Sequence, residues 1–312
     1  MGHVSRKLLH PLQNVSFRLF VACIQSLPNP IWLHRFGRAI GHLSRLLALT
    51  WRRRTRHNLE LILGDRVPAH EHRRILNGVL EQSSCGFCEI FWPNQRHGVA
   101  MSDWVSLSGL HHLDEALAKG RGAIVVTAHL GSWSLLPRWL QEAGYDVASL
   151  LRLPSNSAAH QRMGELLRDD LGLTCYGTPL SRADLQATMR LLRRNGVLFI
   201  VADRRVGDVR LDFLGHPAWC ATGTASFHLR TGAAIVPARI LRDGAAHKAQ
   251  IFPALEWDLS GDKRTDERII TQRMHDVFGE WIMQAPDQWM WNHLRWRPRS
   301  RDVRRGLEEE MR

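Results

Sequence analysis

Long apolar runs are scarce in this 312-residue chain. The first one, residues 12–27, is interrupted by Arg18 and Gln25, and Pro28 follows it. It is shorter and more polar than the roughly 20 apolar residues that a bilayer-spanning helix needs. It also lacks a small-residue cleavage site, so no cleavable signal peptide is expected.

Cysteine is sparse as well. The five cysteines are an odd number without framework spacing, which argues against a disulfide scaffold and favours a reducing, cytosol-facing location. Cys85 and Cys88 form a C-x-x-C pair, but no second pair follows at zinc-ribbon spacing. Core packing is therefore the favoured interpretation, with a metal or redox role as the alternative. We expect no metal site.

Three motifs of common enzyme classes are absent. Without G-x-G-x-x-G or G-x-x-x-x-G-K-[ST], nothing supports a nucleotide cofactor, and we expect no cofactor at all. Without a G-x-S-x-G elbow, a serine hydrolase is not expected.

Positive charge, by contrast, is plentiful. Lys and Arg total 42 against 30 Asp and Glu, a net charge of +12 that favours anionic partners such as nucleic acid, acidic lipid or an acidic carrier protein. Leu33, Phe36, Ile40, Leu43 and Leu47 recur at helical spacing between basic residues. This pattern predicts a basic amphipathic helix, which either lies on a membrane surface or packs on its own domain.

A dense basic run follows at residues 51–57. On charge alone it could bind nucleic acid or anionic lipid, or it could be a solvated helix face. No nucleic-acid recognition motif accompanies it, so a nucleic-acid partner is not expected.

From residue 122 onward, short apolar segments alternate with helical ones. Strands are expected at 122–128, 147–151, 197–202, 233–240 and 248–255, and helices at 132–143, 158–171, 182–194, 222–231 and 265–284. This alternation predicts a three-layer α/β/α domain with a mainly parallel central sheet. We expect a helical membrane-associating region at 1–50, the main domain at 51–298 and a charged tail at 299–312.

Two polar residues follow predicted strands at the edge where α/β enzymes bind ligands. His129 ends the first strand and Asp203 ends the third. A neutral imidazole beside a helix N-terminus suits a general base. Gly131 permits a tight turn, and Ser132 is a plausible N-cap of the next helix, whose free N–H groups could hold an oxyanion or phosphate.

Arg152 and Asn156 follow at the same predicted edge, and Arg204 comes directly after Asp203. Arg168 lies on the next predicted helix and can face either way. An arginine at this edge can bind a substrate phosphate or carboxylate, or it can pair with Asp203.

Six segments in order resemble the bacterial lipid A late acyltransferases, the lauroyl/myristoyl group of the glycerolipid-acyltransferase-like superfamily. They are Arg-His-Asn-Leu-Glu at 56–60, Thr-Ala-His-Leu-Gly-Ser-Trp at 127–133, the Arg152, Asn156 and Arg168 block, Ala-Asp-Arg at 202–204, Asp-Phe-Leu-Gly-His-Pro-Ala at 212–218, and Ala-Pro-Asp-Gln-Trp-Met-Trp-Asn-His at 285–293. The resemblance covers residues 10–298.

This resemblance implies an enzyme at the cytoplasmic face of the inner membrane. Such enzymes move a fatty acyl group from acyl carrier protein, sometimes coenzyme A, to a hydroxyl of a membrane glycolipid such as a lipid A precursor. His129 would be the general base, and no metal would take part. The anionic membrane and the acidic carrier protein both suit the basic N-terminal region.

One position departs from the family pattern, which is His-x4-(Asp/Glu): Ser134 stands where the family has an acid. A serine can orient an imidazole but cannot neutralise its charge. Another carboxylate, with Asp203 as the candidate, could take this role. Alternatively, the acceptor could differ from lipid A and need a weaker base, or the chain could be a catalytically reduced relative that binds acyl carrier protein or lipid.

Overall fold

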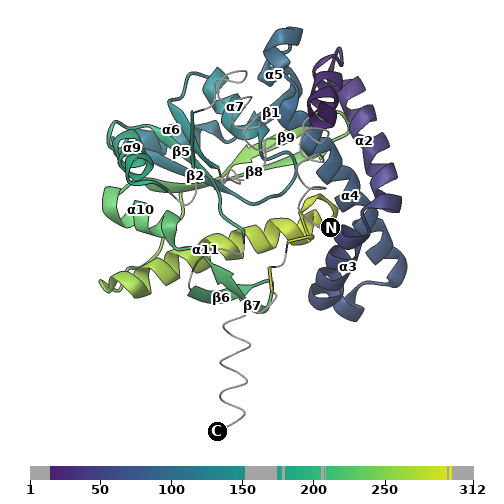
Figure 1. The fold of residues 1–312 in the computed structure, drawn as a ribbon. Helices are drawn as coiled ribbons and strands as arrows, with labels where there is room; N and C mark the ends of the chain where they lie inside the picture. The colour runs from purple at the N-terminus through teal and green to yellow at the C-terminus, as the bar shows by residue number, and fades with distance from the viewer. Residues whose placement is uncertain are drawn as a thin grey trace, which may run out of the picture.

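A seven-stranded sheet forms the centre of the protein, which we describe from a computed structural model covering residues 15–151, 174–177, 180–204, 207, 209–293 and 295–296 (Figure 1). The strand order is β1-β9-β8-β2-β5-β3-β4. The strands are β1 (Val105–Ser108), β2 (Ala123–Thr127), β3 (Val147–Leu151), β4 (Thr174–Gly177), β5 (Val197–Val201), β8 (Ala234–Asp243) and β9 (Ala246–Ile251).

Most of this sheet is parallel, as the sequence predicts. Strands β8, β2, β5, β3 and β4 pair in parallel. Strand β9 is antiparallel to β8, and β1 is parallel to β9. The hairpin β6 (Val209–Phe213) and β7 (His216–Cys220) forms a separate two-stranded sheet.

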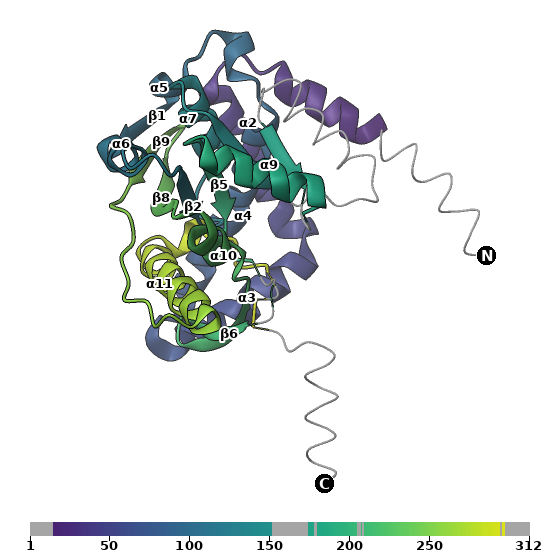
Figure 2. The ribbon, with the colours of Figure 1, turned by 90° about the vertical axis from the view of Figure 1, so that its left-hand side faces the viewer.

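Helices cover both faces of the sheet because its strands bury side chains on both sides. On β2, Ile124 and Val126 enter one apolar cluster, and Ala123 and Val125 enter the other. The first cluster includes side chains from α9 (Arg182–Arg193), α10 (Gly223–Thr231) and α11 (Lys263–Gln284), and the second includes side chains from α5 (Met101–Trp104), α6 (Leu110–Leu117) and α7 (Leu135–Glu142). Figure 2 shows α11 and the β6–β7 hairpin on one side of the sheet.

Helices α2 (Pro30–Leu47), α3 (Leu49–Leu63) and α4 (Ala69–Phe91) lie beside this domain, and residues 15–25 are helical as well. Gly37 and Gly41 let α2 approach α4 closely, since a Cβ on Gly37 would lie 2.8 Å from the Cα of Cys85. Within the described ranges, none of the helices has the length and apolar character of a bilayer span.

The α2 helix presents apolar side chains both to the protein and to solvent. Leu33 is buried in the core, while Trp32, Leu46 and Leu47 are exposed. The basic run at 51–57 lies on α3, where Thr55 is buried and Arg53 is exposed. The thiols of Cys85 and Cys88 are free and buried, and burial raises the pKa of each to about 12.

Several predicted boundaries need correction. Helix α7 begins at Leu135 rather than at residue 132, and β9 covers 246–251 rather than 248–255. The sequence prediction lacked β1, β4 and the β6–β7 hairpin. The predicted helix at 158–171 lies outside the described residues.

Candidate functional site

Parallel pairing brings His129 and Asp203 to the same edge of the sheet. Thr127 of β2 pairs with Val201 of β5, and each polar residue comes two positions after its strand's paired residue. The backbone N–H of Ala202 also donates to the carbonyl oxygen of Thr127 at 2.9 Å. The segments after β2 and β5 therefore run side by side beyond the sheet, and the side chains of His129 and Asp203 meet there.

His129 is bound by Asp203 at two points. Its Nδ1 lies 2.5 Å from Oδ1 of the carboxylate, and its backbone N–H donates to Oδ2 at 2.9 Å. Asp203 is 1% exposed and His129 is 9% exposed. Burial by itself would raise the pKa of Asp203, but the contacts with His129 and the hydrogen bond from Trp289 outweigh it and hold that pKa well below its usual range. The carboxylate is therefore ionised, and it fixes the imidazole with Nε2 as the reactive nitrogen.

A second imidazole lies beside the first. The rings of His293 and His129 meet edge to face with centroids 5.1 Å apart. Burial, with the neighbouring His129, lowers the pKa of His293 to about 3. His293 therefore remains neutral next to His129 at physiological pH.

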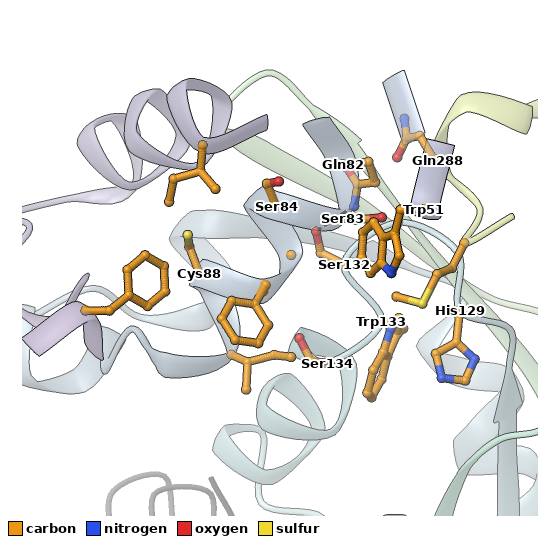
Figure 3. Close-up of a pocket in the computed structure, with 17 residues that line it drawn as sticks. Trp51, Gln82, Ser83, Ser84, Cys88, His129, Ser132, Trp133, Ser134 and Gln288 are labelled. Atoms are coloured by element: carbon orange, nitrogen blue, oxygen red, sulfur yellow. Dashed lines mark hydrogen bonds between the residues drawn. The ribbon is translucent and has the colours of Figure 1, made fainter. Parts of the chain in front are cut away.

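Ser134, which occupies the family's acid position, does not bind His129. The side chain of Ser134 makes no capping hydrogen bond. The Nδ1 atom of His129, which an acid at position 134 would bind, is bound by Asp203 instead. In Figure 3, Ser134 and His129 lie on opposite sides of Trp133. The geometry thus favours the first of the three interpretations, in which Asp203 supplies the carboxylate.

The turn after His129 is held from both sides. The N–H of Gly131 donates to the carbonyl of Gln288 at 2.9 Å, and the N–H of Met290 donates to the carbonyl of His129 at 3.1 Å. Gly131 has φ +57°, and a Cβ there would overlap the carbonyl oxygen of Ile240. The turn therefore requires glycine.

Ser132 is not the helix cap that the sequence suggests. Its Oγ is buried and accepts a hydrogen bond from Arg242 Nη2 at 2.9 Å, while α7 begins three residues later. In the described part of the chain, the backbone N–H groups of Ser132, Trp133 and Ser134 have no acceptor. Ser134 is the N-cap residue of α7, and Ser132 and Trp133 lie in the turn that joins His129 to this helix.

An apolar cavity of about 370 Å³ opens beside the histidine (Figure 3). His129, Gly131 and residues 132–134 form one part of its lining. The other lining residues come from the N-terminal helices and the C-terminal segment: Phe20, Ile40, Trp51, Gln82, Ser83, Ser84, Gly86, Phe87, Cys88, Ile90, Gln288 and Met290.

Of the four basic and amide residues predicted to bind substrate, the structure describes only Arg204, which does not line this cavity. Arg152, Asn156 and Arg168 lie outside the described residues. Arg204 is exposed, and its carbonyl oxygen accepts a hydrogen bond from Arg295 at 2.9 Å. A group of three possible metal ligands lies on α6, at His111, His112 and Glu115, and none of them lines the cavity.

The first and last family-like segments meet in space. Asn58 of α3 donates from Nδ2 to the carbonyl oxygens of Trp291 and His293, at 2.6 and 2.7 Å. Sequence reasoning did not assign roles to Glu89, Arg242 or Gln288, which also contact the site. Glu89 and Arg242 lie in no motif. They are 153 positions apart, so no local sequence pattern indicates that they pair.

The histidine and the buried carboxylate meet at the carboxyl edge of the parallel strands and beside an apolar cavity, which is the place where α/β proteins bind their ligands. The comparisons identify the family: the chain belongs to the bacterial lipid A biosynthesis acyltransferases, which it matches over residues 1–298.

Relatives in this family are named acyltransferases. The chain is 26% identical to the lipid A biosynthesis lauroyltransferase of Escherichia coli K12, over 96% of each chain. It is 27% identical to the lipid A biosynthesis acyltransferase of Haemophilus influenzae, over 88% of this chain and 87% of the relative. It is 32% identical to the phosphatidylinositol mannoside acyltransferase of Mycobacterium tuberculosis H37Rv, over 61% of this chain, and the match spans only 59% of that protein's length.

Proposed function

We propose that this protein transfers a fatty acyl group from an acyl thioester to a hydroxyl group of a membrane glycolipid, with His129 as general base. The main observation in support is that His129, held by the buried carboxylate of Asp203, lines an apolar cavity. Family membership and the acyltransferase names of the relatives support the reaction class.

The proposed chemistry uses the nitrogen of His129 that Asp203 leaves available. Nε2 takes the proton of the acceptor hydroxyl while its oxygen attacks the thioester carbonyl carbon, so that an imidazolium and a tetrahedral oxyanion form. The C–S bond then breaks, the new ester is released, and the thiolate takes the proton from the imidazolium. Asp203 stabilises the imidazolium between these two steps.

The turn offers a place for the oxyanion. The N–H groups of Ser132, Trp133 and Ser134 lack acceptors among the residues that the structure describes, and they lie in the turn that leads into α7. Such donors stabilise the charge that develops on the carbonyl oxygen, and one donor contributes about 10²–10³ in turnover in comparable sites.

The surface favours an acidic donor and an anionic membrane. A net charge of +12 and the arginines of α3 suit acyl carrier protein as the thioester carrier. The exposed Trp32, Leu46 and Leu47 of α2 suit shallow insertion in a lipid interface. We infer that the enzyme acts at the cytoplasmic face of the inner membrane.

The acceptor is the least constrained part of this proposal. Relatives are named for lipid A and for phosphatidylinositol mannoside, which are both glycolipids. Because Ser134 replaces the family's acid, an acceptor other than lipid A is the second candidate. A catalytically reduced relative that only binds acyl carrier protein or lipid is the outcome to exclude.

The test is a transfer assay with purified full-length protein. Acyl carrier proteins and coenzyme A with chains of several lengths serve as donors, and a lipid A precursor and a phosphatidylinositol mannoside serve as separate acceptors. Transfer that is lost in His129→Ala supports the proposal. Binding of acyl carrier protein without transfer from any donor to either acceptor contradicts it.

Membrane association is tested separately by co-sedimentation with vesicles that contain anionic phospholipid. Binding that weakens with salt and in Trp32→Ala supports a surface-lying α2. Equal recovery in the supernatant with and without vesicles contradicts it.

A further inference from the structure

A buried ion pair lies directly behind the turn that follows His129. Arg242, near the end of β8, binds the carboxylate of Glu89 on α4 through two bonds, Nη1–Oε1 at 2.5 Å and Nη2–Oε2 at 2.8 Å. The side chains of Arg242 and Glu89 are 9% and 2% exposed. Burial by itself would raise the pKa of Glu89, but Arg242 and His247 outweigh it and hold that pKa well below its usual range. The pair is therefore ionised.

The guanidinium of Arg242 also binds the turn itself. Its Nη2 donates to Oγ of Ser132 at 2.9 Å, and its Nε donates to Oε1 of Gln82 at 2.7 Å. Gln82 and Glu89 lie seven residues apart on α4, two helical turns along one face. Glu89 and Gln82 thus fix the plane of the guanidinium, and the guanidinium fixes Ser132.

The backbone of Arg242 completes the connection. The side-chain amide of Gln288 accepts from the N–H of Arg242 at 2.8 Å and donates to its carbonyl oxygen at 3.1 Å. The carbonyl of Gln288 in turn accepts from the N–H of Gly131. Gly131 is therefore linked to Arg242 through Gln288, and Ser132 is linked to Arg242 directly through its hydroxyl.

A buried ion pair is weak evidence for stability, because desolvation offsets much of the attraction. The pair instead fixes the orientation of a planar guanidinium, which binds Glu89 through two hydrogen bonds and also donates to Gln82 and Ser132. The three N–H groups without acceptors belong to Ser132 and to the two residues that follow it.

We propose that Arg242 and Glu89 are positioning residues that hold the N–H groups of Ser132, Trp133 and Ser134 where the oxyanion of the acyl-transfer step forms. The inference rests on the proposed function for its chemistry. It predicts that loosening the pair misplaces these donors, and a misplacement of about 1 Å lowers turnover by up to roughly 100-fold.

Ser132→Ala is the first test, because it removes the contact to the turn and leaves the ion pair intact. We expect kcat to fall about 10- to 100-fold with little change in the KM for the acyl thioester. The matched control is Thr188→Val, which removes the hydrogen bond of an equally buried hydroxyl on α9. Its kcat should stay close to that of the wild type.

Arg242→Lys is the second test. Lysine keeps the charge opposite Glu89 but cannot bind Glu89, Gln82 and Ser132 together. We expect a similar fall in kcat, and Ser132→Ala added to this variant should cost less than about threefold more, since both changes remove one connection. Full additivity, or a Ser132→Ala enzyme with wild-type kcat, would overturn the inference.

Hydrogen–deuterium exchange separates this inference from the proposed function. Peptides that cover residues 129–136 should exchange faster in Ser132→Ala and Arg242→Lys than in the wild type, and α11 peptides should not change. Unchanged exchange at the turn overturns the positioning role even if no donor and acceptor give turnover. If the wild type shows no acyl transfer but the variants exchange faster at the turn, the proposed chemistry is rejected. The role of Arg242 and Glu89 in holding the turn is then still supported.

Discussion

Trp289 donates a hydrogen bond from its indole Nε1 to Oδ2 of Asp203 at 2.7 Å. The same oxygen accepts the backbone N–H of His129, so Oδ1 is left for the imidazole. Three groups from two distant residues, two on His129 and one on Trp289, thereby set the orientation of one carboxylate. This arrangement explains how Asp203 can serve His129 although Ser134 replaces the family's acid.

The first prediction concerns Asp203. Asp203→Asn should preserve the fold and lower kcat by about 10³–10⁴, because an amide cannot stabilise the imidazolium and favours the wrong tautomer. Acyl transfer at substrate saturation measures kcat, and circular dichroism checks the fold. Trp289→Phe is the matched control: it keeps the carboxylate and removes one hydrogen bond, so its loss should be much smaller. Comparable losses in the two variants would argue against the assigned role of Asp203.

The second prediction concerns Ser134. Ser134→Glu should not raise kcat by more than about threefold, because Asp203 already occupies Nδ1 of His129. Ser134→Ala should behave like the wild type, since the serine side chain makes no capping hydrogen bond. The assay compares initial rates at equal folded protein. A gain of tenfold or more with the glutamate would mean that the natural site lacks an acid.

The third prediction concerns Gly131. Gly131→Ala should reduce transfer to near background and lower the melting temperature, because its Cβ meets the Ile240 carbonyl at a positive φ. Gly144→Ala is the control: it has φ +91° but open space around a Cβ, so only the backbone strain of about 1–2 kcal/mol remains. Equal effects of the two substitutions would show that conformational strain alone explains the loss at Gly131.

The fourth prediction concerns stability and pH. Burial lowers the pKa of His275 to about 4 in the folded protein, against an ordinary value of 6.5. The unfolded chain therefore binds more protons between these values, and stability is lost as the pH falls from about 6.5 to 4. For this one group the loss is up to about 3 kcal/mol.

Urea unfolding at several pH values measures this effect. His275→Gln should flatten the free energy of unfolding across that window. A substitution of the exposed His111 should leave the slope unchanged. A wild-type slope in His275→Gln would place the acid sensitivity elsewhere, for example at His293, whose pKa burial lowers to about 3.

Local pattern was enough to predict five of the seven strands of the central sheet. The apolar segments of β2, β3 and β5 are continuous because they are buried on both faces. The same strand ends indicated His129 and Asp203. These features depend on residues close together in the sequence.

The structural features that the sequence analysis missed depend on contacts between residues far apart in the sequence. Strand β1 has only four residues and alternates in burial, so its pairing with β9 decides its conformation. The β6–β7 hairpin turns at Leu214 and Gly215, which both have positive φ, and a leucine gives no turn signal there. The helix start was misplaced because Arg242, 110 positions away, binds the hydroxyl of Ser132.

The order in which the site's parts occur along the chain has a consequence for biosynthesis. His129 and Asp203 are followed by Gln288, Trp289 and Met290, which close the turn and orient the carboxylate. Domains begin to fold from the N-terminus while the ribosome is still adding residues. A nascent chain whose residues 288–290 are still inside the ribosome can therefore form the sheet, but its turn after His129 and its Asp203 carboxylate lack the contacts that position them.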